Sequence, residues 1–161
     1  MELFNAHFHR IYRYLDRVSG EPDLAADLAQ ETFVRLYRRG SVPDAPAAWL
    51  ITVALNLWRN VKATRGRRRR LLSLERGEGI QADPPPSPEQ ATVAEEARRR
   101  VRRVLDRLPE REQRLLLLRA EGYSYRDLAA ALELNEASVG TLLRRARETF
   151  RQTYEAAFDA P

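Results

Sequence analysis

Two groups of mostly basic side chains in this sequence have the residue types and spacing to bind a charged ligand. One group places seven bases and no acid within twelve positions, namely Arg59, Lys62, Arg65, Arg67, Arg68, Arg69 and Arg70. The other lies on the polar face of the last helix that the periodicity predicts, at Ser138, Thr141, Arg144, Arg145 and Arg147. Guanidinium groups donate paired hydrogen bonds to phosphate, so both groups favour a polyanionic partner. Two simpler interpretations remain open: solvated helix ends carry similar charge, and a GC-rich genome also enriches arginine.

The sequence gives little support to an enzyme. His7 and His9, the only histidines, stand two positions apart and so face different sides of a helix, where they cannot form a metal pair. The absence of cysteine excludes disulfides and thiolate metal sites. Neither a glycine-rich phosphate loop nor a nucleophile elbow is present. We therefore expect a non-enzymatic protein without a cofactor.

The distribution of charge and proline predicts two domains. Residues 1–76 and 98–161 each contain 14 Lys and Arg, whereas residues 77–97 contain five acids and no base. The run from Asp83 to Pro88 has four prolines and cannot propagate a helix. We expect two small helical domains, residues 1–76 and 91–161, joined by an acidic, proline-rich linker at residues 77–90.

Helical periodicity runs through both parts of the chain and predicts an all-α fold. Gly20 and Gly40 should end the first two helices, and Asp44 should cap the third, with Pro46 in its first turn. Trp49 falls on the apolar face of that third helix and is expected in the core, whereas Trp58 lies off it and could stack on a base or contact a partner. After the linker, helical character should resume near Glu89.

The last two predicted helices have the form of a helix-turn-helix. Ser124 and Asp127 are spaced as a capping box that opens a short helix ending near Leu132. Asn135 can cap the final helix, and Ala129 is a small residue where the two helices would cross. An ordinary pair of surface helices is the alternative. A helix-turn-helix would place the final helix in the major groove of DNA, where base edges can be distinguished.

Several motifs together resemble the RNA polymerase sigma factors of the extracytoplasmic-function (ECF) subfamily. The segment from Asp23 to Phe33 resembles the polymerase-gripping helix of the N-terminal sigma domain. Trp49-Leu50 with Ala54 and Asn56 resembles that domain's promoter-melting helix. Three further segments resemble the C-terminal promoter-binding domain, namely Leu108 to Gln113, Gly122 to Tyr125 and Arg145 to Arg147. A linker in place of a middle domain points to the ECF group.

The resemblance implies a role for each matching residue. Core-polymerase contacts would come from Asp27, Gln30, Glu31 and Phe33, although capping and core packing would also explain these residue types. Contacts to the melted minus-ten element would come from Asn56, Arg59, Lys62 and Arg65. Contacts to the minus-thirty-five element would come from Ser138, Thr141, Arg144 and Arg145. The sequence departs from the family pattern at Glu133, where glycine is usual, and at Gly140 and Leu142, where bases are frequent.

The partners implied are core RNA polymerase, promoter DNA and an anti-sigma factor. No apolar run approaches the roughly 20 residues that a bilayer span needs, so we expect no membrane insertion and a cytoplasmic location. The competing interpretation is a stand-alone helix-turn-helix repressor that binds duplex DNA unaided. It would leave the Asp23 to Phe33 motif and the Trp49 to Asn56 helix without a role.

Overall fold

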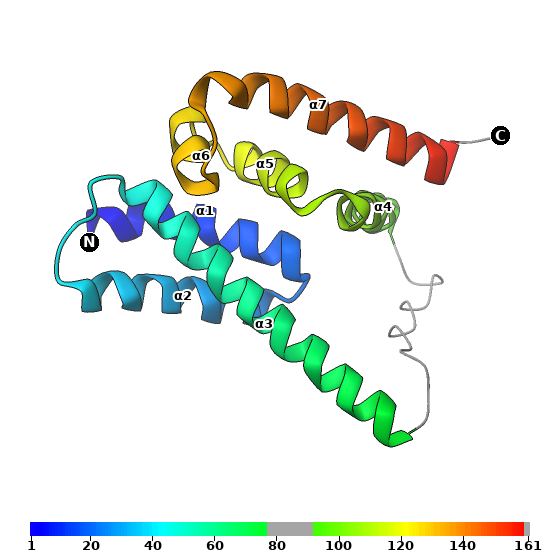
Figure 1. The fold of residues 1–161 in the computed structure, drawn as a ribbon, viewed down its shortest axis with the longest axis horizontal. Helices are drawn as coiled ribbons and strands as arrows, with labels where there is room; N and C mark the ends of the chain where they lie inside the picture. The colour runs from blue at the N-terminus through cyan, green and yellow to red at the C-terminus, as the bar shows by residue number, and fades with distance from the viewer. Residues whose placement is uncertain (77–91, 160–161) are drawn as a thin grey trace.

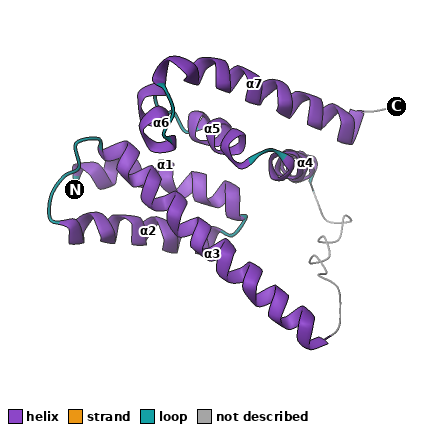
Figure 2. Ribbon diagram, viewed as in Figure 1, coloured by secondary structure: helices purple, strands orange, loops and turns teal. Residues whose placement is uncertain are grey.

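The computed structural model describes residues 1–76 and 92–159, and every regular element in these two ranges is helical, as the sequence predicts (Figures 1 and 2). The elements are α1 (Glu2–Ser19), α2 (Pro22–Arg39), α3 (Pro46–Arg76), α4 (Val93–Arg107), α5 (Glu110–Ala120), α6 (Tyr125–Leu132), α7 (Glu136–Tyr154) and a short π-helical extension, η2 (Glu155–Asp159). In the described ranges, none of the helices is long and apolar enough to pass through a bilayer.

The first three helices form the N-terminal domain. Gly20 and Gly40 follow α1 and α2 with φ of 69° and 76°, the left-handed conformation in which glycine ends a helix without steric cost. The first of these reversals folds α2 back against α1, and α3 crosses both helices (Figure 1). The predicted ends of the first two helices are therefore confirmed.

The third helix has a packed half and a projecting half. Leu50, Ile51 and Ala54 are buried near its start, and Trp49 packs beside them as predicted. Its 31 residues span about 46 Å, and the second half extends away from the body of the molecule (Figure 1). Leu71 and Leu74 are exposed on this projecting half.

The remaining helices form the C-terminal domain, in which α7 packs across α4, α5 and α6 (Figure 2). Val104 of α4, Leu118 of α5, Leu128 of α6 and Leu143 of α7 are fully buried. Ala129 is also buried, in agreement with its expected place where α6 and α7 cross.

The structure corrects two details of the helix ends. The third helix starts at Pro46, and the Trp49 amide donates to the Ala45 carbonyl at 3.0 Å, so Ala45, not Asp44, occupies the cap position. Helix α4 starts at Val93, where Thr92 and Glu95 form a capping box that the sequence did not predict. Glu89, near which helical character was predicted to resume, lies outside the described residues.

The second correction concerns Ser124. Its hydroxyl accepts a hydrogen bond from the Asp127 amide at 3.1 Å, but within the described residues the reciprocal bond of a capping box is absent. Ser124 is therefore a simple N-cap. The proline-rich segment of the predicted linker, with residues 77–91, lies outside the described residues.

The two domains share one apolar core. The buried cluster runs from Ile11, Tyr14 and Leu50 in the N-terminal domain to Leu115 and Leu128 in the C-terminal domain. Helix α3 packs against α6, and α1 contacts α5. The described part of the protein is thus a closed body in which each domain covers part of the other.

Candidate nucleic-acid interface

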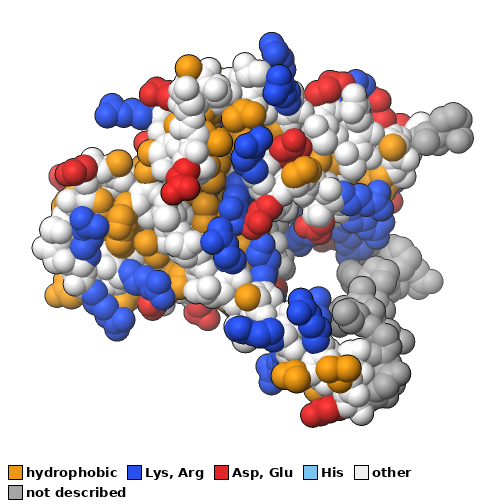
Figure 3. Space-filling view, in the orientation of Figure 1, with side chains coloured by type: hydrophobic (Ala, Val, Ile, Leu, Met, Phe, Trp, Pro, Cys, Tyr) orange, Lys and Arg blue, Asp and Glu red, His pale blue; other side chains and the backbone are white. Residues whose placement is uncertain are grey.

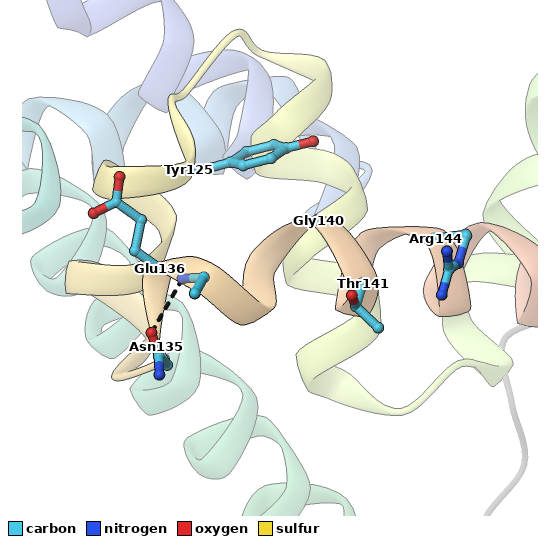
Figure 4. Close-up of a pocket in the computed structure, with 7 residues that line it drawn as sticks. Tyr125, Asn135, Glu136, Gly140, Thr141 and Arg144 are labelled. Atoms are coloured by element: carbon cyan, nitrogen blue, oxygen red, sulfur yellow. Dashed lines mark hydrogen bonds between the residues drawn. The ribbon is translucent and has the colours of Figure 1, made fainter.

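The α6–α7 unit has the local geometry of a helix-turn-helix. The Asn135 side chain accepts a hydrogen bond from the Ala137 amide at 3.1 Å and so caps α7, as predicted (Figure 4). The tight turn before it passes through Glu133, which has a left-handed backbone with φ 56° and ψ 50°. Leu128 and Val139 are fully buried on the facing sides of the two helices. The packing fixes α7 and leaves its opposite face to solvent.

The residues predicted to read DNA lie on that outer face. Ser138, Thr141, Arg144 and Arg145 are all exposed on α7. Thr141 and Arg144 line an open hollow together with Tyr125 and Gly140 (Figure 4). Arg144 and Arg145 also line a second hollow further along the helix. Side chains of this kind can donate to phosphate oxygens and to guanine, and the Thr141 methyl can contact thymine.

The arginines on α7 are not equally available to bind an external anion. Arg151 pairs with Glu148 and, at 2.8 Å, with Glu155. Among the described residues, neither Arg144 nor Arg145 forms an ion pair with a carboxylate. These two guanidinium groups are therefore free to bind an external anion.

Tyr125 lines the same hollow as Thr141 and Arg144, although the sequence did not single it out as a site residue. Its ring lies over Gly140, where an added Cβ would stand 3.5 Å from the tyrosine Cε2 atom (Figure 4). The Arg119 guanidinium lies 5.0 Å from the centroid of the same ring. The sequence feature that could have indicated Tyr125 is an aromatic residue directly after the Ser124 cap, at the start of α6.

The second basic group lies on α3, and its members have different surroundings. Asn56 and Arg59 are exposed. Arg65 instead forms a two-pronged ion pair with Glu21 at the start of α2, with the Nη2 atom 3.0 Å from Oε1. This hydrogen-bonded guanidinium lowers the pKa of Glu21. Arg65 thus fastens α3 to α2 in this structure.

Lys62 faces the other domain. Its ammonium nitrogen lies 3.3 Å from Oε1 of Glu110, the first residue of α5, and 5.7 Å from the centroid of the half-buried Trp58 ring. Burial alone would raise the pKa of Glu110, but Arg114, Lys62 and Arg59 together lower it, so this carboxylate stays charged. Two of the bases predicted to handle the minus-ten element therefore surround an acidic group of the same chain.

The residues predicted to contact a polymerase also differ in their surroundings, since some are exposed and others are paired or buried. Asp27 and Gln30 are exposed on α2, and Glu31 is half-buried and pairs with Arg35 at 3.4 Å. Phe33 is buried, with its ring 5.2 Å from that of Phe4 and 5.8 Å from that of Phe8. The Phe33 side chain therefore belongs to the core of the N-terminal domain, whereas Asp27 and Gln30 are presented to solvent.

Comparisons with known proteins match the two domains separately. Residues 3–70 match the family model described as sigma-70 region 2, and residues 98–150 match the one described as sigma-70, region 4. The chain is 32% identical over 153 residues to the ECF RNA polymerase sigma factor SigE of Mycolicibacterium smegmatis, which covers 93% of this chain and 59% of that protein. The chain thus spans about three fifths of that relative's length.

Two further likenesses cover more of the other chain. The RNA polymerase sigma-H factor of Pseudomonas aeruginosa is 32% identical over 152 residues, covering 87% of this chain and 78% of that protein. A solved structure, the sigma factor RpoE of Bartonella quintana in complex with the anti-sigma factor NepR, superposes with a TM-score of 0.65 at 19% identity. It covers 96% of this chain and 95% of its own, and the likeness concerns the fold.

Proposed function

Because the chain belongs to the ECF sigma factors of RNA polymerase, with sigma-70 regions 2 and 4, we propose that it binds core polymerase and directs it to particular promoters. The observation that carries this proposal is the pair of basic helices, α3 and α7, placed in different domains. A protein that must hold an opened strand and an upstream duplex needs two such surfaces. Its place of action would be the bacterial cytoplasm, where transcription occurs.

The exposed side of α2 is the proposed polymerase-binding surface. Asp27 and Gln30 supply a carboxylate and an amide that point away from the core, and Glu31 adds a second carboxylate beside Arg35. Phe33 acts indirectly, because its buried ring fixes α2 against α1. We assign it a positioning role within the surface.

The minus-ten surface in this proposal lies on α3. Asn56 can pair with an unstacked base, and Arg59 and Lys62 can neutralise the adjacent phosphates. Arg65 would join them only after leaving Glu21, so its first role is to hold α3 in place. The projecting half of α3 continues the basic track through Arg67 to Arg70, which are all exposed.

The minus-thirty-five surface is the outer face of α7. Thr141, Arg144 and Arg145 would meet base edges and phosphates in the major groove, with Ser138 beside them. Since Arg144 and Arg145 carry no carboxylate partner among the described residues, DNA would not have to displace one. We place the domain boundaries at residues 76 and 91, with the intervening segment as the connection between the two surfaces.

An anti-sigma factor is the third proposed partner. The Bartonella quintana RpoE, which has the same fold, was crystallised with the anti-sigma factor NepR. A regulator of this class would bind across the two domains and keep both DNA-facing helices from promoters.

Transcription from genomic DNA tests the proposal directly. Core polymerase should initiate at a defined set of 5′ ends only when this protein is added. An Arg144→Ala/Arg145→Ala variant should lose initiation at those sites and bind promoter duplex at least tenfold more weakly, since a good bidentate base contact is worth about 1–3 kcal/mol. The control, Arg103→Ala/Arg107→Ala, removes the same charge from exposed positions of α4.

Equal loss in both variants would show that net charge alone matters and would contradict the assignment to α7. Tight binding of the unaided protein to a duplex operator, with no new transcripts, would instead favour the stand-alone repressor.

A further inference from the structure

Basic side chains are spread widely over the surface of this protein. Figure 3 shows Lys and Arg side chains on both domains of one face of the molecule. Contacts between such bases and phosphate attract any duplex and carry no sequence information. Promoters must therefore be distinguished by side chains that reach the base edges, and the outer face of α7 holds the candidates.

Gly140 leaves an open space on α7 that the fold itself does not require. Its backbone is helical, unlike that of Gly20, Gly40 and Gly122, which have positive φ. An added Cβ atom would stand 3.5 Å from the Cε2 atom of Tyr125, which is an ordinary van der Waals contact. Glycine is also less favourable than alanine in the interior of a helix. Neither backbone conformation nor packing therefore explains a glycine at this position.

The space beside Gly140 belongs to the hollow between the start of α6 and α7 (Figure 4). Its lining includes the Tyr125 ring, Ala137 and Thr141, that is, an aromatic ring and two side chains that carry a methyl group. Ala137 and Thr141 stand one helical turn apart on the exposed face, opposite the buried Val139. Aromatic, alanine and threonine side chains are the types that contact the C5-methyl group of thymine in the major groove.

The Tyr125 ring is held beside this space by Arg119 of α5. The Arg119 guanidinium lies 5.0 Å from the ring centroid, within the range of a cation–π contact. The same guanidinium donates to the Tyr123 carbonyl oxygen at 2.8 Å, which fixes the arginine side chain. Tyr125 is 39% exposed, which leaves part of its ring open to a ligand in the hollow. The ring thus forms a fixed wall.

The charges around the hollow favour a base edge as its occupant. Glu136, the first residue of α7, lines the hollow with an exposed carboxylate, which repels phosphate. In a T·A pair the N6 amino group of adenine, a hydrogen-bond donor, lies in the same groove as the thymine methyl group, and a carboxylate can accept from it. Arg144, about two turns further along α7, can bind a phosphate or a neighbouring guanine. A G·C pair presents no methyl group to the hollow.

On the basis of the sigma function proposed above, we propose that Tyr125 and Gly140 determine specificity for the minus-thirty-five element by holding the C5-methyl group of one thymine in this hollow. That methyl group is the one apolar group that base edges present in the major groove. Gly140 admits it, and Tyr125, Ala137 and Thr141 surround it. A longer side chain at position 140 would project into the same space.

Deoxyuridine scanning tests this assignment, because deoxyuridine pairs like thymidine and lacks only the C5-methyl group. The templates are promoter fragments from the sites at which core polymerase initiates with this protein. Each thymine of the minus-thirty-five element, on either strand, is replaced in turn, and the affinity of the complex of core polymerase and this protein is measured for each duplex. We expect one position at which deoxyuridine weakens binding about fourfold, the change that corresponds to burial of one methyl-sized group at about 0.8 kcal/mol.

Two variants should abolish the difference between the thymine and deoxyuridine duplexes. Tyr125→Ala removes the wall of the hollow, and Gly140→Arg fills the hollow with a guanidinium group. Tyr125→Phe keeps the ring and should retain the fourfold difference. Ala156→Arg, which adds the same charge at an exposed position of η2, should also retain it. Because each ratio compares two duplexes bound by the same protein, the general effect of charge on affinity cancels.

The proposal is overturned if no deoxyuridine in the element weakens binding by the wild-type protein. It is also overturned if the difference persists in either Tyr125→Ala or Gly140→Arg, or if Ala156→Arg loses it. None of these results bears on the sigma function, because initiation at defined promoters is measured separately on unmodified templates. Failure to initiate at any promoter would contradict the sigma function and, with it, the role given to the hollow.

Discussion

Some basic side chains of this protein are held by a carboxylate of the same chain, whereas others have no carboxylate partner among the described residues. Arg65 is held by Glu21 and Arg151 by Glu148 and Glu155, whereas Arg144 and Arg145 have no such partner in the described ranges. Exposed ion pairs stabilise a protein by only about 0–1 kcal/mol, so these pairs contribute little to stability, but they occupy the guanidinium groups that an external anion would bind. The unpaired ones are therefore the stronger candidates for DNA contact.

His7 should make stability depend on pH. Partial burial, followed by the nearby Arg10 cation, lowers its pKa from the ordinary value of 6.5, and the Asp127 carboxylate only partly opposes this. Below about pH 6.5 the unfolded chain takes up a proton on His7 that the folded protein resists, so the free energy of unfolding should fall as the pH drops.

Urea unfolding of wild type and His7→Gln between pH 7.5 and about pH 5.5 measures this effect, because carboxylates titrate mainly below that range. The decline should be smaller in His7→Gln, and His9→Gln serves as the control for removing a histidine. Parallel curves for wild type and His7→Gln would contradict the role given to His7.

At the scale of elements, the turn between α6 and α7 carries strain at one residue. Glu133 adopts φ 56°, a conformation that costs a residue with a Cβ atom roughly 1–2 kcal/mol and glycine much less. Glu133→Gly should therefore raise the free energy of unfolding by about 1 kcal/mol in urea titrations. Glu133→Ala keeps the Cβ atom and should give no comparable gain, so equal stabilisation by both would assign the effect to charge.

Helix ends show what could be read from the sequence and what could not. Gly20 and Gly40 end α1 and α2 as predicted, because a left-handed residue is a local requirement that glycine meets. The capping box that starts α4 was not predicted, although Thr92 and Glu95 have the spacing of one. Proline disfavours helical backbone at the residue before it, so with Pro46 as the first residue of α3 the cap position falls on Ala45 and not on Asp44.

Contacts between elements were largely beyond sequence reasoning. The exposure of Thr141, Arg144 and Asn56 followed from helical periodicity, which assigns each position to a face. The pairing of Lys62 with Glu110, 48 positions away, depends on how two domains meet and leaves no local pattern. For Phe33 the sequence offered both a polymerase contact and core packing, and only the fold shows that its ring completes the aromatic cluster of α1 and α2.

At the scale of the whole molecule, the two domains depend on each other for stability. Domains of this size bury a modest fraction of their surface, so the apolar core that they share stabilises both.

Binding to core RNA polymerase is the property on which the proposed function depends, and co-elution with bacterial core polymerase tests it most directly. Wild type should co-elute at a one-to-one ratio. Asp27→Ala/Gln30→Ala should lose at least tenfold in affinity while keeping its helical circular dichroism, because both side chains are exposed. Arg38→Ala, at an exposed α2 position outside the proposed surface, should bind like wild type. Failure of the wild-type protein to associate with core polymerase would contradict the account.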